Sequence, residues 1–188
     1  MKNRFLKVLA VLAAGSSLSA GASAQSNTAP QSSPCSGEEF RQLDFWVGDW
    51  HAEWDNGDGT TGFGENLITR DEYGDCVIYE RFSTENFAGA PFRGMSVSTY
   101  HAPVGAWRQS WVDDSGGYFA LVGGPGGEND DYDFMVENTR IVDSAPYRRM
   151  IWQDVTPDSF TWRWQGRASE DEAWADLWVI LYTRADRE

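Results

Sequence analysis

Phe45-Trp46-Val47-Gly48-Asp49-Trp50 opens a long run of β-type sequence, directly after a short segment whose pattern indicates a helix. A Gly-x-Trp on a first strand is typical of small β-barrels. In such a barrel the Trp closes one end, and the Gly allows another backbone to come close. The stretch therefore predicts a fold, and it says little about a reaction.

Downstream of this stretch, short apolar-rich runs alternate with turn residues such as Asn56-Gly57-Asp58-Gly59 and Pro157-Asp158. About eight to ten strands at this spacing predict an antiparallel meander. Because closure removes exposed edges, a meander of this length closes into a barrel or folds into a sandwich. We therefore predict an all-β fold, a closed barrel preceded by a short N-terminal helix. The runs are 45–54, 62–69, 75–85, 94–101, 106–113, 118–123, 131–139, 147–154, 158–167 and 173–184.

The N-terminal helix is predicted from a capping-box pattern. Ser36 is followed three residues later by Glu39, which favours a helix that starts at Ser36 and runs through Leu43. Phe40 and Leu43 are the apolar side chains that this helix would turn toward the barrel.

The beginning of the chain has the pattern of a secretory signal peptide. Basic residues precede an apolar run over 6–14, and Ala22-Ser23-Ala24 forms an A-x-A cleavage site. The apolar run is too short to span a bilayer, so we predict no membrane span and a periplasmic or secreted protein. The predicted organisation is a signal peptide over 1–24, a disordered leader over 25–34 with a mature start at Gln25, and a single β-barrel domain over 35–188.

The net charge indicates which partners the protein repels, and the cysteines indicate the redox state of its compartment. The chain has 29 acidic against 15 basic residues, a formal net charge of −14, which repels nucleic acid and anionic lipid. Both lysines, Lys2 and Lys7, lie in the predicted signal peptide, which excludes Schiff-base chemistry from the mature chain. Two cysteines in an oxidising compartment favour a Cys35–Cys76 disulfide.

Aromatic residues dominate the predicted strands, and ten of them are tryptophans. Alternation puts several tryptophans on one face of a strand, as with Trp162 and Trp164. Two interpretations stay open: these side chains fill a solid core, or they line a cavity for a small apolar or aromatic molecule. The candidate ligand-binding tryptophans are Trp46, Trp50, Trp107, Trp111, Trp162 and Trp164.

Polar residues embedded in apolar strands are further candidates for ligand contact: Glu80, Gln109 and Arg184. Asn66, which precedes Leu67 and Ile68, is a polar residue of the same kind. If they face inward, each needs a partner, because an orphan buried polar group costs about 1–3 kcal/mol. A Glu80–Arg184 or Glu80–Arg163 ion pair would satisfy that need internally. The polar head of a ligand would do the same.

Several motifs taken in order resemble those of a secreted bacterial family of unknown function with a calycin-like (lipocalin-like) barrel. The resemblance covers roughly residues 35–184 and implies a fold with hardly any chemistry. More distantly, the Gly-x-Trp opening is similar to that of lipocalins, fatty-acid-binding proteins and the haem-binding nitrobindins. The motifs are Phe45-Trp46-Val47-Gly48-Asp49-Trp50, Gly64-Glu65-Asn66-Leu67-Ile68, Cys76-Val77-Ile78-Tyr79-Glu80, Tyr100-His101-Ala102-Pro103, Trp107-Arg108-Gln109-Ser110-Trp111-Val112-Asp113 and Tyr182-Thr183-Arg184.

Cofactor, metal and catalytic motifs give no positive prediction. Haem would need His51 or His101 inside the barrel, and both are expected at the surface or in a turn. The acidic stretch 128–133 does not match a helix-loop-helix calcium pattern. No Gly-x-Ser-x-Gly elbow is present. We therefore predict no catalytic residue, no metal and no cofactor.

The pattern favours a non-catalytic binder of a small apolar or aromatic molecule in the barrel interior. Two alternatives stay open. One is a barrel enzyme that uses an inward carboxylate, Glu80 or Asp113, as acid or base. The other is a cell-envelope interaction module with a filled core and exposed tryptophans.

Overall fold

The computed structural model describes residues 34–70, 75–137 and 147–185 of the chain. The predicted signal peptide, and all of the predicted leader except residue 34, lie outside the described residues. In this part of the chain, none of the helices has the length and apolar character that crossing a bilayer requires. The helices are three short 3-10 turns, η1 (Glu38–Arg41), η2 (Asp44–Trp46) and η3 (Glu128–Asp130).

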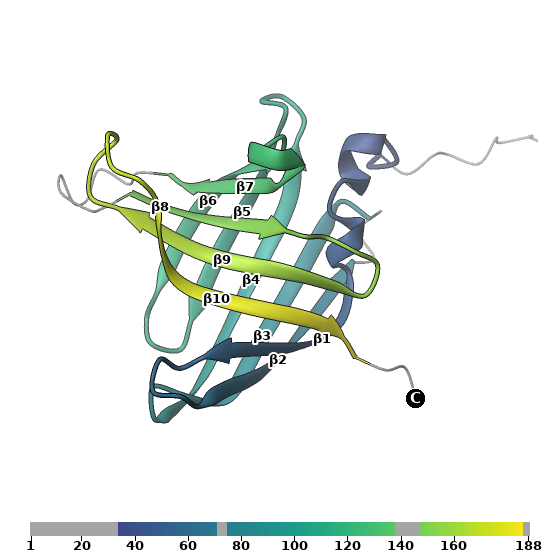
Figure 1. Ribbon diagram of the computed structural model, residues 1–188. Coiled ribbons are helices and arrows are strands. Elements are labelled where there is room, and N and C mark those ends of the chain that lie inside the picture. Colours follow the sequence, from purple (N-terminus) through teal and green to yellow (C-terminus); the bar gives the residue numbers. More distant parts are fainter. Residues whose placement is uncertain (1–33, 71–74, 138–146, 186–188) are drawn as a thin grey trace, which may run out of the picture. The chain divides into compact units, whose positions relative to one another are not determined.

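Ten antiparallel strands form one closed barrel in which each strand pairs with its neighbours in the chain and β1 pairs with β10 (Figure 1). The prediction of an all-β closed meander is confirmed, and each of the predicted runs corresponds to one strand. Because successive turns of a meander lie at alternate ends, the β3–β4 and β5–β6 turns share one barrel end. The strands are β1 (Gly48–Asp55), β2 (Thr61–Arg70), β3 (Val77–Phe87), β4 (Ala90–His101), β5 (Ala106–Asp113), β6 (Tyr118–Pro125), β7 (Tyr132–Val136), β8 (Tyr147–Gln153), β9 (Ser159–Arg167) and β10 (Ala175–Arg184).

Side-chain alternation decides which residues face the barrel interior. In β1, Trp50, Ala52 and Trp54 are buried, and the residues between them are exposed. The closed ring turns this inward face of every strand toward one shared core. The aromatic side chains that the sequence places at alternate positions therefore meet inside the barrel.

The Gly-x-Trp of β1 fills one end of the barrel, which we call the closed end. The Trp50 ring lies 4.7 Å from that of Phe160, and its Nε1 donates to Trp46 O at 2.8 Å. The Arg184 guanidinium covers the same ring at 4.1 Å from its centroid. Gly48 has a φ of 146°, and a Cβ there would collide with Nη1 of Arg184. The glycine thus makes room for a guanidinium, so the prediction that it admits another backbone is wrong.

The N-terminal segment lies against the barrel as η1 and η2, the purple-blue turns of Figure 1, and the predicted capping box is wrong. The N-cap residue of η1 is Gly37, and no side chain caps it. Leu43 and Trp46 are almost completely buried. Since packing stabilises so short a segment more than a cap does, burial of these side chains overrides the local signal from Ser36 and Glu39.

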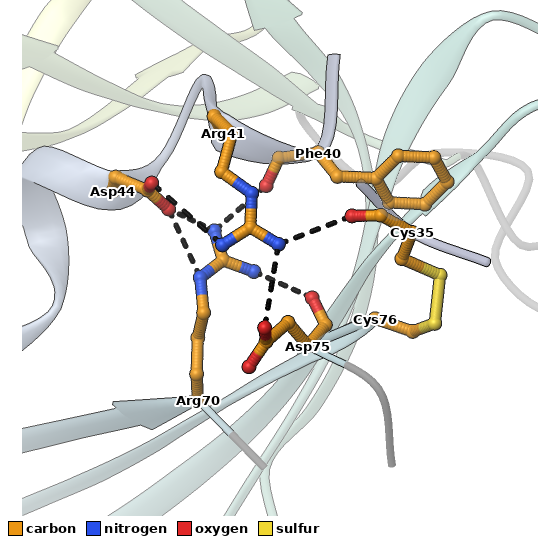
Figure 2. A network of polar contacts seen from close by, with 7 residues as sticks. All are labelled: Cys35, Phe40, Arg41, Asp44, Arg70, Asp75 and Cys76. Carbon is orange, nitrogen blue, oxygen red and sulfur yellow. Dashed lines mark hydrogen bonds and ion pairs between the residues drawn. A yellow bond between two sulfur atoms is a disulfide. The ribbon is translucent and has the colours of Figure 1, made fainter. Parts of the chain in front are cut away.

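Arg70 fastens this segment to the barrel (Figure 2). Its Nε donates to Asp44 Oδ1 at 2.9 Å, and its Nη2 donates to Phe40 O at 2.7 Å and also to Asp44. Its Nη1 donates to Asp75 O at 2.8 Å, just before β3. One planar group thus joins η1, η2, β2 and the approach to β3, which only a guanidinium with its five donors does.

The Cys35–Cys76 disulfide is present beside this network (Figure 2). The two Cα atoms are 5.1 Å apart, and the cysteines are separated by 41 residues in the chain. Arg41 Nη2 donates to Cys35 O at 3.1 Å and lies 3.8 Å from a carboxylate oxygen of Asp75. The start of the described chain is therefore tied covalently and by charge to the residues that lead into β3.

Candidate functional site

A cavity of about 360 Å³ lies inside the barrel, toward the end that carries the β3–β4 and β5–β6 turns. The interior is therefore neither solid nor hollow throughout, because the closed end is packed and the other end leaves space. Most of the lining is apolar, and more than half of the lining residues are aromatic. The lining residues are Glu80, Phe82, Phe87, Phe92, Gln109, Trp111, Asp113, Ser115, Phe119, Leu121, Met150, Trp152, Trp162, Trp164, Leu177, Trp178, Ile180 and Tyr182.

Tryptophans from neighbouring strands build the cavity wall. The rings of Trp162 and Trp164 are parallel, with centroids 6.3 Å apart on β9. Trp178 of β10 meets Trp162 edge-on at 5.8 Å. The indole ring of Trp111 reaches over Gly94 of β4, which pairs with Asp113, and a Cβ at Gly94 would collide with that ring. The ring contacts fix one another, so the wall is preformed.

A buried polar cluster adjoins the cavity, and Glu80 of β3 is its centre. Asn66 Nδ2 donates to Glu80 Oε1 at 2.8 Å, and Ser96 Oγ donates to Glu80 Oε2 at 2.6 Å. Gln109 Nε2 donates to both Ser96 Oγ and Ser98 Oγ, each at 3.1 Å. Four adjacent strands, β2 to β5, thus bring these side chains together by cross-strand register. We call Asn66, Glu80, Ser96, Ser98 and Gln109 the polar cluster.

Burial controls the ionisation of Glu80 and its neighbour Tyr182. Burial raises the pKa of Glu80, although the hydrogen bonds from Ser96 and Asn66 oppose the rise. Burial, together with the nearby Glu80 carboxyl, raises the pKa of Tyr182 well above its ordinary value of 10. Among the described residues no cation contacts Glu80. Burial therefore shifts its ionisation equilibrium toward the neutral form, compared with a carboxyl group in water.

The pH dependence of stability should reveal this raised pKa. Below the unfolded-state pKa near 4.5, Glu80 is protonated in both states and its contribution to the free energy of unfolding is at its maximum. That contribution is lost as the pH rises through the higher folded-state pKa. Wild type should therefore lose stability relative to Glu80→Gln, by up to about 1.4 kcal/mol per pH unit in that window. Urea unfolding of both proteins at a series of pH values measures the difference.

Glu53→Gln is the matched control for this prediction, since Glu53 is an exposed carboxylate on β1. The pH series for wild type and Glu80→Gln is compared with the same series for this variant. A constant difference between wild type and Glu80→Gln would contradict a raised pKa at Glu80.

Asp113 lies among the lining residues where β5 ends, near the β5–β6 turn. Burial by itself would raise its pKa, but hydrogen bonds from Ser115, Gly117 and Trp111 together hold the pKa below the ordinary value. Ser115 Oγ donates to Oδ1 at 2.6 Å, and Trp111 Nε1 donates to Oδ2 at 3.0 Å. The cavity therefore has an ionised carboxylate at this end and a buried carboxyl of raised pKa at Glu80.

The structure separates the sequence-predicted site residues into two groups. Glu80, Gln109, Trp111, Trp162 and Trp164 line the cavity together. The remaining candidates lie in the closed end and do not line it: Trp46, Trp50, Trp107 and Arg184.

Each of these four closed-end side chains has a structural partner. Trp46 packs edge-on against Trp152 at 5.1 Å, and Trp107 Nε1 donates to Gln42 Oε1 at 3.0 Å. Trp50 lies between Phe160 and the Arg184 guanidinium. The N-terminal segment packs into this end and occupies the space that a ligand would need.

Neither of the two arginine ion pairs that would have satisfied Glu80 internally forms, and Asn66 and Ser96 bond it instead. Arg184 instead donates to Pro157 O at 2.8 Å, Val47 O at 3.2 Å and Phe45 O. Arg163 bonds Gln153 Oε1 at 2.8 Å and the Asp176 carboxylate. Both guanidinium groups thus take partners away from the polar cluster.

Sequence reasoning missed part of the site. Ser96 and Ser98 carry no chemical signal of their own. Ser96 meets Glu80 because β4 pairs with β3 in this register, and Ser98 meets Gln109 because β4 pairs with β5. The sequence pattern could have identified Phe82 and Trp178 as lining residues. Phe82 lies two residues after Glu80 and so faces the same side of its strand, and Trp178 lies in the last apolar run. Both histidines, His51 and His101, are exposed, and neither lines the cavity.

Comparisons with known proteins show the fold. No family model matches the chain, and no curated protein matches it either. The crystal structure of Rv2717c from M. tuberculosis is similar, with a TM-score of 0.55 and 13% identity over 80% of this chain and 99% of that one. A redesigned β-barrel has a TM-score of 0.39 and 13% identity over 78% of this chain and 96% of that one. The likeness to the M. tuberculosis structure concerns the fold alone.

Proposed function

We propose that the protein is a non-catalytic binder of a small apolar or aromatic molecule, held in the cavity of the barrel. The observation that carries the proposal is a preformed aromatic wall beside a few buried polar groups. Ligand sites typically enclose about 300–1,000 Å³ and combine mostly apolar walls with a few precise polar contacts. A cavity of about 360 Å³ with Trp162, Trp164 and Trp178 in its wall and Glu80 and Gln109 at its polar side has this composition.

We also propose that the protein works in the periplasm or outside the cell and belongs to the calycin-like secreted family that its motifs resemble. The signal-peptide pattern over 1–24 supports export. A disulfide between Cys35 and Cys76 is compatible with an oxidising compartment. The Gly48/Trp50/Arg184 arrangement at the closed end supports the likeness to barrels that open with Gly-x-Trp.

Binding of N-phenylnaphthylamine, a neutral aromatic dye that fluoresces in apolar surroundings, tests the proposed function. Wild type should bind the dye saturably. Trp164→Ala should weaken binding about tenfold, because it removes one ring of the cavity wall.

The control variant for dye binding is Trp174→Ala. Trp174 does not line the cavity, and the guanidinium groups of Arg149 and Arg167 lie 4.4 and 4.5 Å from its ring centroid. Its removal should leave dye affinity unchanged. Equal weakening by both variants, or no saturable binding to wild type, would reject the proposed function.

A second candidate function is favoured by one observation, the raised pKa of Glu80 beside an apolar cavity. A carboxyl group with this property serves as a general acid or base in many enzymes. This alternative predicts that bound molecules are converted and that Glu80→Gln abolishes conversion while binding persists. Mass spectrometry of ligands recovered after incubation distinguishes the two functions.

The interaction-module alternative required a filled core and exposed tryptophans. The cavity is at odds with a filled core. All ten tryptophans lie within the described ranges, and each is buried or half-buried. Neither feature supports that alternative.

A further inference from the structure

The cavity lining contains acidic side chains and, among the described residues, no basic one. Glu80 and Asp113 are carboxyl groups, and the described lining residues include no lysine or arginine. We propose that the cavity selects small aromatic amines in their protonated form, with the ammonium group bound at Glu80. The inference rests on the proposed function and names the class of its ligand.

The polar groups that face a ligand are mainly hydrogen-bond acceptors. Both Nε2 hydrogens of Gln109 are already donated, to Ser96 and Ser98, so the group that Gln109 can offer is its carbonyl Oε1. Each Glu80 oxygen accepts one internal hydrogen bond, from Asn66 or Ser96, and retains a second lone pair. An ammonium group with three N–H donors complements these acceptors. A ligand carboxylate would meet lone pairs and no cation.

The aromatic wall favours the same charge. The face of an indole ring attracts a cation through its quadrupole, and the attraction grows when water is excluded. Trp111, Trp162 and Trp164 line the same cavity as the two carboxyl groups. Folding has already removed Glu80 from water, so the hydration lost on binding is mainly that of the ammonium group. The net charge of −14 adds long-range attraction for cations.

Binding of the ammonium group should be coupled to release of a proton from Glu80. Asn66 of β2 and Ser96 of β4 bond Glu80, and Gln109 of β5 bonds Ser96; none of these three side chains titrates, and Tyr182 of β10 stays neutral. Burial favours protonated Glu80 when no cation is near, whereas a bound ammonium group favours the carboxylate. Amine affinity should therefore rise with pH up to the pKa of Glu80, while affinity for a neutral analogue stays level.

Calorimetric titration with tryptamine, tryptophol and indoleacetate tests the inference, because the three share one ring system and differ in the charge of the head. Tryptamine should bind about tenfold more tightly than tryptophol, as expected for one charge-assisted hydrogen-bonded contact, and indoleacetate should bind more weakly than either. Titrations in two buffers of different ionisation enthalpy should show proton release for tryptamine alone.

Glu80→Gln should abolish the preference for tryptamine over tryptophol. If this variant fails to fold, the wild-type head-group series and the proton release remain decisive. Dye binding with no preference for tryptamine would overturn the inference and leave the proposed function standing. Loss of the preference in Asp113→Asn but not in Glu80→Gln would overturn the assignment to Glu80. Failure of the dye and of all three indoles to bind would reject the proposed function itself.

Discussion

Replacing Trp50 with alanine is expected to lower the free energy of unfolding by about 3–5 kcal/mol. The side chain is 1% exposed and packs against Phe160 at 4.7 Å. Its Nε1 donates a hydrogen bond to Trp46 O, and the Arg184 guanidinium lies over its ring, 4.1 Å from the ring centroid. The variant therefore leaves a cavity, frees a buried acceptor and removes the surface on which Arg184 rests. Urea unfolding followed by far-ultraviolet circular dichroism measures the loss.

Trp164→Ala is the matched comparison for Trp50→Ala, because it makes the same change of side chain in the same barrel. Trp164 is half-buried and already borders open space in the cavity. Its removal should cost clearly less stability while it weakens ligand binding. A smaller loss in Trp50→Ala than in Trp164→Ala would contradict the division into a packed end and a cavity end.

Loss of the Cys35–Cys76 disulfide is expected to lower the free energy of unfolding by about 4 kcal/mol, from the loop-closure entropy of the unfolded chain. The bridge closes a loop of 41 residues that contains η1, η2, β1 and β2. Without it, the N-terminal segment keeps only its non-covalent contacts, the hydrogen bonds of Arg70 and Arg41 and the burial of Leu43 and Trp46. The double variant Cys35→Ser/Cys76→Ser and reduced wild type should give the same result in urea.

Ser36→Ala is the control for the disulfide prediction. Gly37, and not Ser36, is the N-cap of η1, so this change should leave stability nearly unaltered. A working capping box would instead cost about 1 kcal/mol on the same substitution. Stability that depends on Ser36 and is indifferent to the disulfide would contradict this view of how the segment is fastened.

The strand pattern was readable from the sequence because it is local. Alternation along a strand, as at Trp50, Ala52 and Trp54, depends only on neighbouring residues and the pleat of the backbone. The disulfide was equally accessible, since only one pairing of Cys35 and Cys76 exists. The helical cap failed because burial of Leu43 and Trp46 outweighs a single side-chain cap.

By itself, then, the sequence determined which residues form strands, which of their side chains face inward and that Cys35 and Cys76 pair. Only the tertiary structure decided how deep in the barrel each inward residue lies. Trp50 and Trp164 have the same local pattern, yet one lies in the packed end and the other borders the cavity. The physical reason is that axial position depends on strand register, ring closure and the segment packed into one end, all of which join residues far apart in the chain.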